Sequence, residues 1–194
     1  MKLIFIAILA YLIGTISFSV IISKLLFNDD VRRHGSGNAG STNMIRAYGF
    51  KIGVITFIFD MLKGVLAALI GKWIAGTDGA YIAGIMVIVG HNWPVFMQFK
   101  GGKGVATTIG VLLSLHPIVT LICFIIGVSI AFAGRIVSIG SLIGVTLSAI
   151  VLISRYFENY KLVIFCLIYA GMCLFKHREN IKRLMKGEEK KLKL

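Results

Sequence analysis

The residues best suited to chemistry lie in one stretch from Gly35 to Asn43, which interrupts an otherwise strongly apolar chain. It reads Gly-Ser-Gly-Asn-Ala-Gly-Ser-Thr-Asn, so it combines three glycines with two amides and three hydroxyls. Glycines allow close approach of the backbone to a ligand, and successive backbone N–H groups in such turns bind anions. Arg46 follows and can form a bidentate fork with phosphate. The stretch predicts a phosphate-binding loop formed by Gly35, Gly37, Gly40, Thr42, Asn43 and Arg46, with Ser36 and Asn38 as neutral donors. The alternative is a flexible interhelical loop, in which these residue types are common.

A second glycine-rich cluster, from Lys100 to Gly104, is followed by two threonines at 107 and 108. It is not a nucleotide-binding P-loop, because Walker A requires Ser or Thr directly after the Gly-Lys pair and a strand before it. Glycine backbone and a lysine at a helix N-terminus nevertheless bind phosphate. The predicted ligands are Gly101, Gly102, Lys103, Gly104 and Thr107. The alternative is a basic loop whose charge only sets topology.

Two further polar clusters occur later in the chain. Arg135, Ser138 and Ser141 place a cation and two hydroxyls around the start of an apolar run, where Ser138 is alternatively a helix N-cap. His177 and Asn180 follow the last apolar run and are neighbours on one face if the helix continues. Histidine is the usual general base near neutral pH. The alternative is an interfacial histidine in a basic tail.

Two polar pairs lie inside apolar runs. Asp60 and Lys63 are three residues apart, so an ion pair within one helix is the simplest interpretation of charges that are costly in a membrane. His91 and Asn92 precede Pro94, which should kink or break the helix. We interpret His91 and Asn92 as residues that support the site. The alternative is that they only satisfy backbone groups left unpaired by the proline.

Composition places the chain in a membrane. Of its 194 residues 57% are hydrophobic, and the mean hydropathy is +0.89, which is too apolar for an ordinary soluble domain. We expect one integral membrane domain covering 1–194. The net charge of +13 fits loops that face anionic lipid better than a nucleic-acid partner. The three cysteines match no metal motif.

Charge placement suggests the number of spans. Six apolar runs are clear and a seventh is short: 3–27, 53–75, 81–99, 105–115 (the short one), 117–133, 139–154 and 162–175. If the short run crosses and the N-terminus is outside, fifteen of the 21 Lys and Arg residues lie in inner loops or the inner tail. That is a strong positive-inside bias. We therefore expect an all-α fold of seven transmembrane helices, N-terminus outside and C-terminus cytoplasmic, with all four polar clusters on the inner face.

The motifs, in this order, resemble one family closely: the bacterial acyl-phosphate:glycerol-3-phosphate acyltransferases of the PlsY type. The matching segments span nearly the whole chain and are 35–43, 60–64, 90–96, 99–107, 135–141 and 177–181. The chain departs from the family's usual pattern at Ile136, where an aromatic is common, and at Ser41, where alanine is common.

The resemblance implies a seven-span enzyme of the bacterial cytoplasmic membrane with its active site on the cytoplasmic face. Its substrates would be acyl phosphate and sn-glycerol 3-phosphate, its products 1-acyl-sn-glycerol 3-phosphate (lysophosphatidic acid) and phosphate, with no metal or organic cofactor. Ser36, Asn38 and Lys103 are then expected to stabilise the oxyanion and departing phosphate, and His177 with Asn180 to position or deprotonate the glycerol hydroxyl. The competing hypothesis is a small transporter of a phosphorylated anion, which the nearly bare outer loops disfavour. The sequence leaves the oligomeric state and the acyl-chain preference open.

Overall fold

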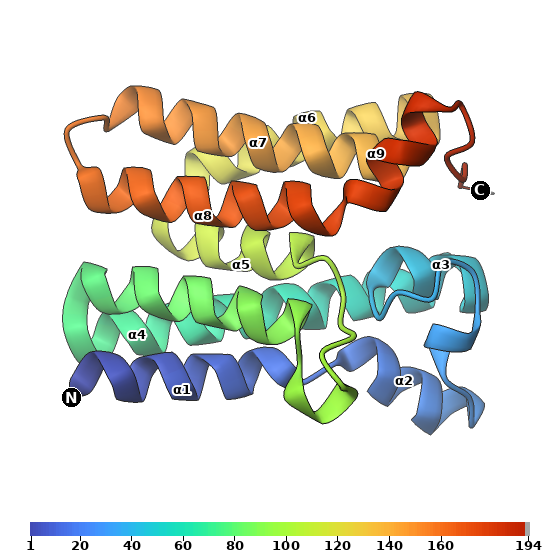
Figure 1. The fold of residues 1–194 in the computed structure, drawn as a ribbon, viewed down its shortest axis with the longest axis horizontal. Helices are drawn as coiled ribbons and strands as arrows, with labels where there is room; N and C mark the ends of the chain where they lie inside the picture. The colour runs from blue at the N-terminus through green and yellow to red at the C-terminus, as the bar shows by residue number, and fades with distance from the viewer. Residues whose placement is uncertain (193–194) are drawn as a thin grey trace. The chain divides into compact units, whose positions relative to one another are not determined.

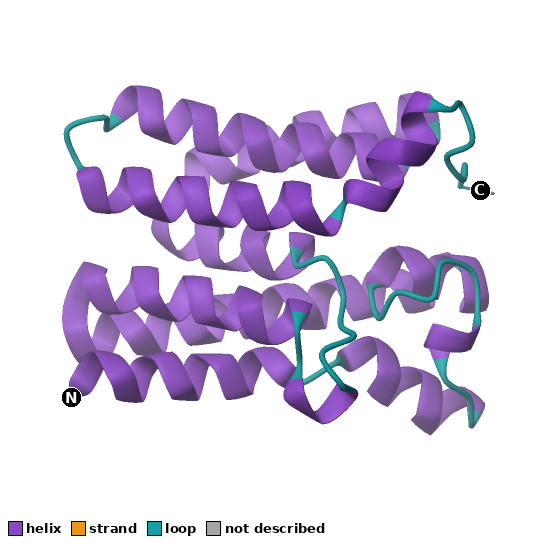
Figure 2. Cartoon of the chain, viewed as in Figure 1, coloured by secondary structure: helices purple, strands orange, loops and turns teal. Residues whose placement is uncertain are grey.

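A computed structural model describes residues 1–192, and within them the chain is helical with no strand. Figures 1 and 2 show the arrangement. Nine α-helices and two short 3₁₀ helices follow one another as α1 (Lys2–Thr15), α2 (Phe18–Phe27), η1 (Val31–Arg33), α3 (Ser41–Tyr48), α4 (Phe50–Asn92), η2 (Val95–Met97), α5 (Val105–Leu115), α6 (Pro117–Gly134), α7 (Val137–Arg155), α8 (Tyr160–Lys176) and α9 (Arg178–Met185). The helices form two compact units, Met1–Ser114 and Leu115–Leu194.

The predicted all-α fold is confirmed, and every apolar run of the sequence is helical over most of its length, although the run 81–99 leaves the α-helix after Asn92. Four helical segments in residues 1–192 are long and apolar enough to cross a membrane, one of them α1 and α2 taken together, or five if the bent pair α8 and α9 is one span. One of the four is α4, which contains two of the predicted runs. The count of seven spans and the orientation of the termini stay predictions.

The first predicted run, from 3 to 27, is not one continuous helix. It breaks at Ile16 and Ser17, which both have extended backbone angles, so α1 and α2 are separate. Lys63 bridges the break: its Nζ donates to the carbonyls of Ile16 (2.6 Å) and Gly14 (3.2 Å). Carbonyls at a helix end have no partner inside the helix, so this buried lysine satisfies them.

Helix α4 folds back on itself and packs against α1. The reversal is at Ala75 and Gly76, where Gly76 has φ +60°, a value that glycine adopts without strain. The second arm of α4 approaches α1 so closely that a Cβ on Gly14 would lie 2.9 Å from the Cα of Gly90. Small residues at such crossings bring helix backbones together in membrane proteins. The second arm ends at Asn92, as Pro94 predicts.

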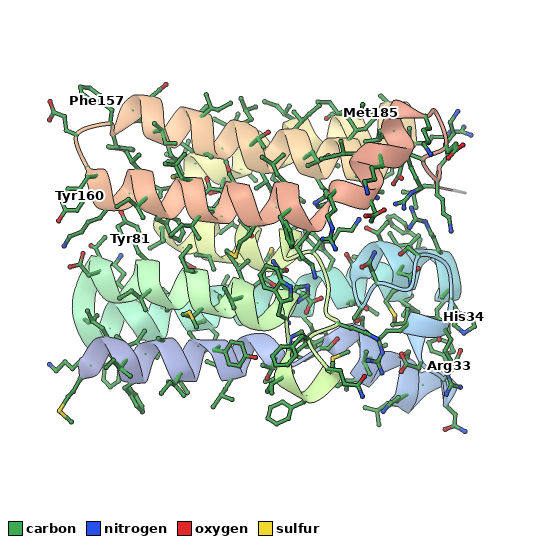
Figure 3. The ribbon with its side chains drawn as sticks, in the orientation of Figure 1. Arg33, His34, Tyr81, Phe157, Tyr160 and Met185 are labelled. Atoms are coloured by element: carbon green, nitrogen blue, oxygen red, sulfur yellow. The ribbon has the colours of Figure 1, made fainter. Side chains whose placement is uncertain are left out.

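At one end of the first unit, α2, η1 and α3 pack around a small core formed by Val20, Val31, Ala39 and Met44. This core anchors both ends of the glycine-rich segment between η1 and α3. Figure 3 shows Arg33 and His34 at this end and Tyr81 near the opposite end of the same unit.

The second unit is built on α6, α7 and α8, with α9 and the following segment at one end (Figure 1). A Cβ on Gly127 of α6 would lie 2.7 Å from the carbonyl oxygen of Gly140 on α7, so these helices also cross at small residues. Exposed Phe157 in the turn between α7 and α8 and exposed Tyr160 at the start of α8 lie at the end of this unit opposite Met185 (Figure 3). Aromatic residues are enriched at membrane–water interfaces.

Candidate active site

Asn43 organises the first glycine-rich loop. Its side chain is buried, and its amide oxygen accepts from the Ser36 N–H (2.8 Å) and hydroxyl (3.2 Å). Its amide nitrogen donates to the carbonyls of Val31 (2.9 Å) and His34 (3.0 Å). One amide thus closes a loop of about ten residues on itself and uses its full hydrogen-bonding capacity for it. Helix α3 begins at Ser41, so Asn43 acts from the first turn of a helix and not from the loop.

Ser36 is the exposed tip of this loop. Gly35 (φ +58°) and Gly37 (φ +73°) flank it in the left-handed region, where a side chain is strained. The Asn38 amide lies 3.5 Å from the Ser36 hydroxyl. Arg46, in the last turn of α3, lies beside the loop, since a Cβ on Gly35 would be 3.7 Å from the Arg46 Cβ. The loop therefore gathers hydroxyl, amide, backbone and guanidinium groups.

An acidic pair fixes the chain just before the loop, a feature that sequence reasoning missed. Asp29 accepts from Tyr48 (2.9 Å) and pairs with His34 (2.5 Å). Hydrogen bonds from Tyr48 and from the backbone of Asp30 lower the pKa of Asp29. Asp30 pairs with Arg32 (2.6 Å), whose hydrogen bond lowers the pKa of Asp30 to about 2. Both carboxylates are therefore charged at neutral pH and hold η1 in place.

The second loop packs on the end of α4. Gly102 donates its N–H to the His91 carbonyl (3.1 Å). Gly104 has φ +78°, and a Cβ there would lie 2.7 Å from the Asn92 amide oxygen. Thr107, in the first turn of α5, is fully buried, and its hydroxyl has no hydrogen-bond partner among the described residues. Lys103 is partly exposed between these packed glycines.

The two glycine-rich loops meet within the first unit. A Cβ on Gly102 would lie 2.7 Å from the carbonyl oxygen of Ala39, which belongs to the first loop. Segments more than sixty residues apart in the sequence thus have their backbones in contact. The structure thus places the two predicted loops in contact at Gly102 and Ala39.

The second unit holds the other predicted residues. Arg135 is exposed and left-handed (φ +55°) in the turn between α6 and α7, Ser138 is buried in the first turn of α7, and Ser141 follows one turn later. The N–H of Leu192 donates to the Arg135 carbonyl (2.7 Å). The chain after α9 therefore returns to the α6–α7 turn.

His177 marks a bend and not a continuous helix. Helix α8 ends at Lys176 and α9 starts at Arg178, with an angle of 57° between them. His177 and Asn180 are nevertheless both buried at this bend. The His177 Nδ1 lies 2.8 Å from the Cys173 carbonyl oxygen. A carbonyl only accepts, so Nδ1 carries a proton, and in the neutral ring Nε2 is the basic nitrogen.

The Glu189 carboxylate links two of the predicted residues of this unit, Ser138 and Asn180. Sequence reasoning also missed Glu189. Its carboxylate accepts from Ser138 (2.9 Å), Asn180 (2.5 Å) and the Arg183 Nε (2.7 Å). Burial alone would raise the pKa of Glu189, but these hydrogen bonds outweigh it and the pKa is lowered. Glu188 and Glu189 are adjacent in a basic tail, and nothing in the sequence singles out the second of them. Among residues 1–192, His, Cys, Asp and Glu side chains form no group of three or more able to hold a metal ion.

Comparison with known proteins assigns the family. A family profile described as glycerol-3-phosphate acyltransferase matches residues 4–187. The glycerol-3-phosphate acyltransferase of Thermoanaerobacter sp. (strain X514) is 47% identical over 186 residues, which cover 96% of this chain and 93% of the relative. The corresponding protein of Alkaliphilus metalliredigens is 46% identical over 94% of this chain and 92% of the relative. The chain belongs to the glycerol-3-phosphate acyltransferase family.

Solved structures agree with the family assignment. The crystal structure of PlsY (YgiH), an integral membrane glycerol 3-phosphate acyltransferase, in its glycerol 3-phosphate form, is 36% identical with a TM-score of 0.93 and covers 100% of this chain and 96% of that one. The lysophosphatidic acid form of the same protein is 35% identical with a TM-score of 0.90. This family member is accordingly an all-helical membrane protein. The roles of its individual site residues stay predictions.

Proposed function

We propose that this protein transfers a fatty acyl group from acyl phosphate to sn-glycerol 3-phosphate. The glycerol hydroxyl oxygen attacks the acyl carbonyl carbon and forms an ester. The bond from that carbon to the phosphate oxygen breaks, and inorganic phosphate leaves with the bonding electrons. The products are 1-acyl-sn-glycerol 3-phosphate and phosphate, the first acylation step of phospholipid synthesis.

The contact between the two glycine-rich loops is the observation that carries this proposal. Both substrates bear a phosphate, and two anion-binding loops meet where Gly102 packs on the Ala39 carbonyl. Arg46 and Lys103 add one cation to each loop. Charge-assisted hydrogen bonds to phosphate are about twice as strong as neutral ones. Two loops in contact can hold both substrates close enough for direct transfer, so proximity supplies much of the rate.

Ser36, Asn38 and Lys103 are proposed to stabilise the charge that develops on the carbonyl oxygen and on the departing phosphate. Ser36 is exposed at the loop tip, and its single hydroxyl proton is donated to the Asn43 amide oxygen. On substrate binding the Ser36 hydroxyl is proposed to turn from Asn43 toward the charged oxygen, because a hydroxyl has only one proton to donate. In the second unit, Arg135 and Ser141 are proposed anion ligands, and Ser138, whose hydroxyl donates to Glu189, is proposed to bind an anion after its hydroxyl turns from that carboxylate.

His177 is proposed to accept the hydroxyl proton. Its Nδ1–H is bonded to the Cys173 carbonyl, which makes Nε2 the acceptor in the neutral ring. A positioned general base contributes about 10²–10⁴-fold. Asn180, held through its amide nitrogen by Glu189, is proposed to orient the hydroxyl.

The membrane provides the acyl chain. The apolar surfaces of α1, α4, α6 and α7 fit a bilayer, from which a fatty acyl phosphate is drawn. The excess of Lys and Arg in the predicted inner loops supports a bacterial cytoplasmic membrane protein whose site faces the cytoplasm.

The test compares acyl donors. Purified protein receives labelled glycerol 3-phosphate with either acyl phosphate or acyl-CoA, and labelled lysophosphatidic acid is extracted. We expect product only with acyl phosphate. Product with acyl-CoA alone would contradict the proposed donor, and labelled substrate that crosses proteoliposomes unchanged would favour the transporter.

The proton acceptor is tested by His177→Ala. We expect a fall of about 10²–10⁴-fold and loss of the inflection near neutral pH in the pH–rate profile. If the same inflection persists in His177→Ala, the titrating group is the substrate phosphate, and His177 is not the base.

A further inference from the structure

A buried charged cluster lies within α4, and none of its members is among the proposed substrate ligands. Asp60 and Lys63 are on the first arm and His91 is on the second, and all three side chains are less than a tenth exposed. Lys63 Nζ lies 2.8 Å from an Asp60 carboxylate oxygen. Ionised groups inside membrane helices are costly and are retained for a purpose. Lys63 serves such a purpose, because it satisfies the carbonyls at the α1–α2 break.

His91 connects this cluster to the second glycine-rich loop. Its Nδ1 lies 3.6 Å from the same Asp60 oxygen. Its carbonyl accepts the N–H of Gly102, and a Cβ on Gly102 would overlap the ring nitrogen Nε2. The ring is therefore held between a carboxylate on one side and the loop backbone on the other.

The neighbouring glycines show how tightly the second glycine-rich loop packs against the end of α4. A Cβ on Gly101 would lie 2.6 Å from the Pro94 Cδ and 3.0 Å from the Asn92 carbonyl oxygen. A Cβ on Gly102 would also lie 2.7 Å from the Ala39 carbonyl oxygen. The loop backbone thus fits between the end of α4 and the first loop, and its glycines are required by packing as well as by any ligand.

We infer that His91 is a positioning residue: its ring, held by Asp60, sets the position of the Gly101–Gly104 loop against the first loop. His91 touches no substrate in this account and acts through the loop backbone. The inference rests on the proposed function, because the loop is proposed to hold a phosphate. Displacing a substrate-holding group by about 1 Å costs on the order of a hundred-fold.

Kinetics separate positioning from a merely structural role. We expect His91→Ala to raise the KM for one of the two phosphate substrates about ten- to a hundred-fold, while kcat and Tm change little. His91→Gln keeps a polar planar group of similar reach and should recover part of the loss. Asp60→Asn should add little to His91→Ala, because groups acting as a unit are not additive.

The matched control is Thr56→Val. Thr56 is also buried on α4, but within residues 1–192 its hydroxyl bonds the Ile52 carbonyl of its own helix (2.8 Å) and no other group. Its KM values should match those of the wild type. A wild-type KM in His91→Ala with a lowered Tm would overturn the inference. If His91→Ala does not accumulate as folded protein, His91→Gln decides, and wild-type kinetics there also overturn it.

A second readout does not depend on catalysis. Lys100 is exposed at the start of the loop, and the three natural cysteines are buried. The thiol of Lys100→Cys should react with a maleimide several-fold faster in the His91→Ala background than with His91 present. An unchanged rate would overturn the inference. Absence of lysophosphatidic acid from the wild type would instead contradict the proposed function and leave this labelling result valid.

Discussion

Replacing Asn43 should disable the first glycine-rich loop while the helices stay folded. Asn43→Ala removes four hydrogen bonds at once, two to Ser36 and one each to the carbonyls of Val31 and His34. A typical hydrogen bond contributes a net ~0.5–1.5 kcal/mol, so the loop loses roughly 2–6 kcal/mol of local stability by the same principle. Asn43→Asp keeps the oxygen that accepts from Ser36 but replaces the donor with a buried carboxylate oxygen that faces the carbonyls of Val31 and His34, so it should lose at least as much as Asn43→Ala.

The assay is the rate of lysophosphatidic acid formation, with Tm measured on the same samples. A loss of ~1.4 kcal/mol is about ten-fold, so a local loss of roughly 2 kcal/mol or more predicts that kcat/KM falls by at least about 30-fold in Asn43→Ala, with a fall no smaller in Asn43→Asp. Tm should fall only slightly because the loop lies outside the packed helices.

Asn159→Ala is the matched control. Asn159 also bonds backbone through its side chain, accepting from Leu162 N–H at the start of α8 (3.2 Å), but it lies at the end of its unit opposite the bend at His177. It should keep near-normal activity. Wild-type kcat/KM in Asn43→Ala would refute the argument that this amide holds Ser36 in its working position.

Three further predictions concern the two site cations, the buried Glu189 carboxylate and the membrane topology. Lys103→Ala and Arg46→Ala should each lose about ten- to a hundred-fold in activity, since a hydrogen bond to a charged group contributes roughly 1.5–3 kcal/mol; near-normal turnover in both would show that the anion site is elsewhere. The lowered pKa of Glu189, against an ordinary 4.5, means that its carboxylate stabilises the fold above about pH 4.5 and loses that contribution as the pH falls through the lowered pKa. The Tm advantage of wild type over Glu189→Gln should therefore be present at pH 7 and shrink in acid, and a pH-independent difference would contradict the hydrogen-bond network. Single cysteines introduced at positions 30, 135 and 190 should be labelled from the cytoplasmic side only. Ready labelling of any of them in intact cells would contradict the seven-span topology.

Several features could be predicted from the sequence because their causes are local. Pro94 ends α4 at Asn92, and the spacing of Asp60 and Lys63 gives the observed ion pair. The break after Thr15 was missed because no proline marks it. It is stabilised instead by Lys63, a residue almost fifty positions away.

The sequence suggests which residues form the site, and their roles stay predictions, but it does not show which hydrogen bonds support them. Residue type alone singled out Ser36, Lys103 and His177, since hydroxyl, ammonium and imidazole groups are chemically distinctive. Asn43 closes the first loop by hydrogen bonds to the carbonyls of Val31 and His34, and no sequence pattern specifies these partners. Glu189 depends on a hydrogen bond to a serine 51 residues away. Long-range partners of this kind appear only when the chain is folded.

The most direct test of the central claim follows both phosphates by ³¹P NMR in one sample of purified protein, acyl phosphate and glycerol 3-phosphate. We predict that the acyl phosphate and glycerol 3-phosphate signals decline together while lysophosphatidic acid and inorganic phosphate rise in equal amounts. Release of inorganic phosphate without lysophosphatidic acid, or no change in either substrate, would contradict acyl transfer between the two.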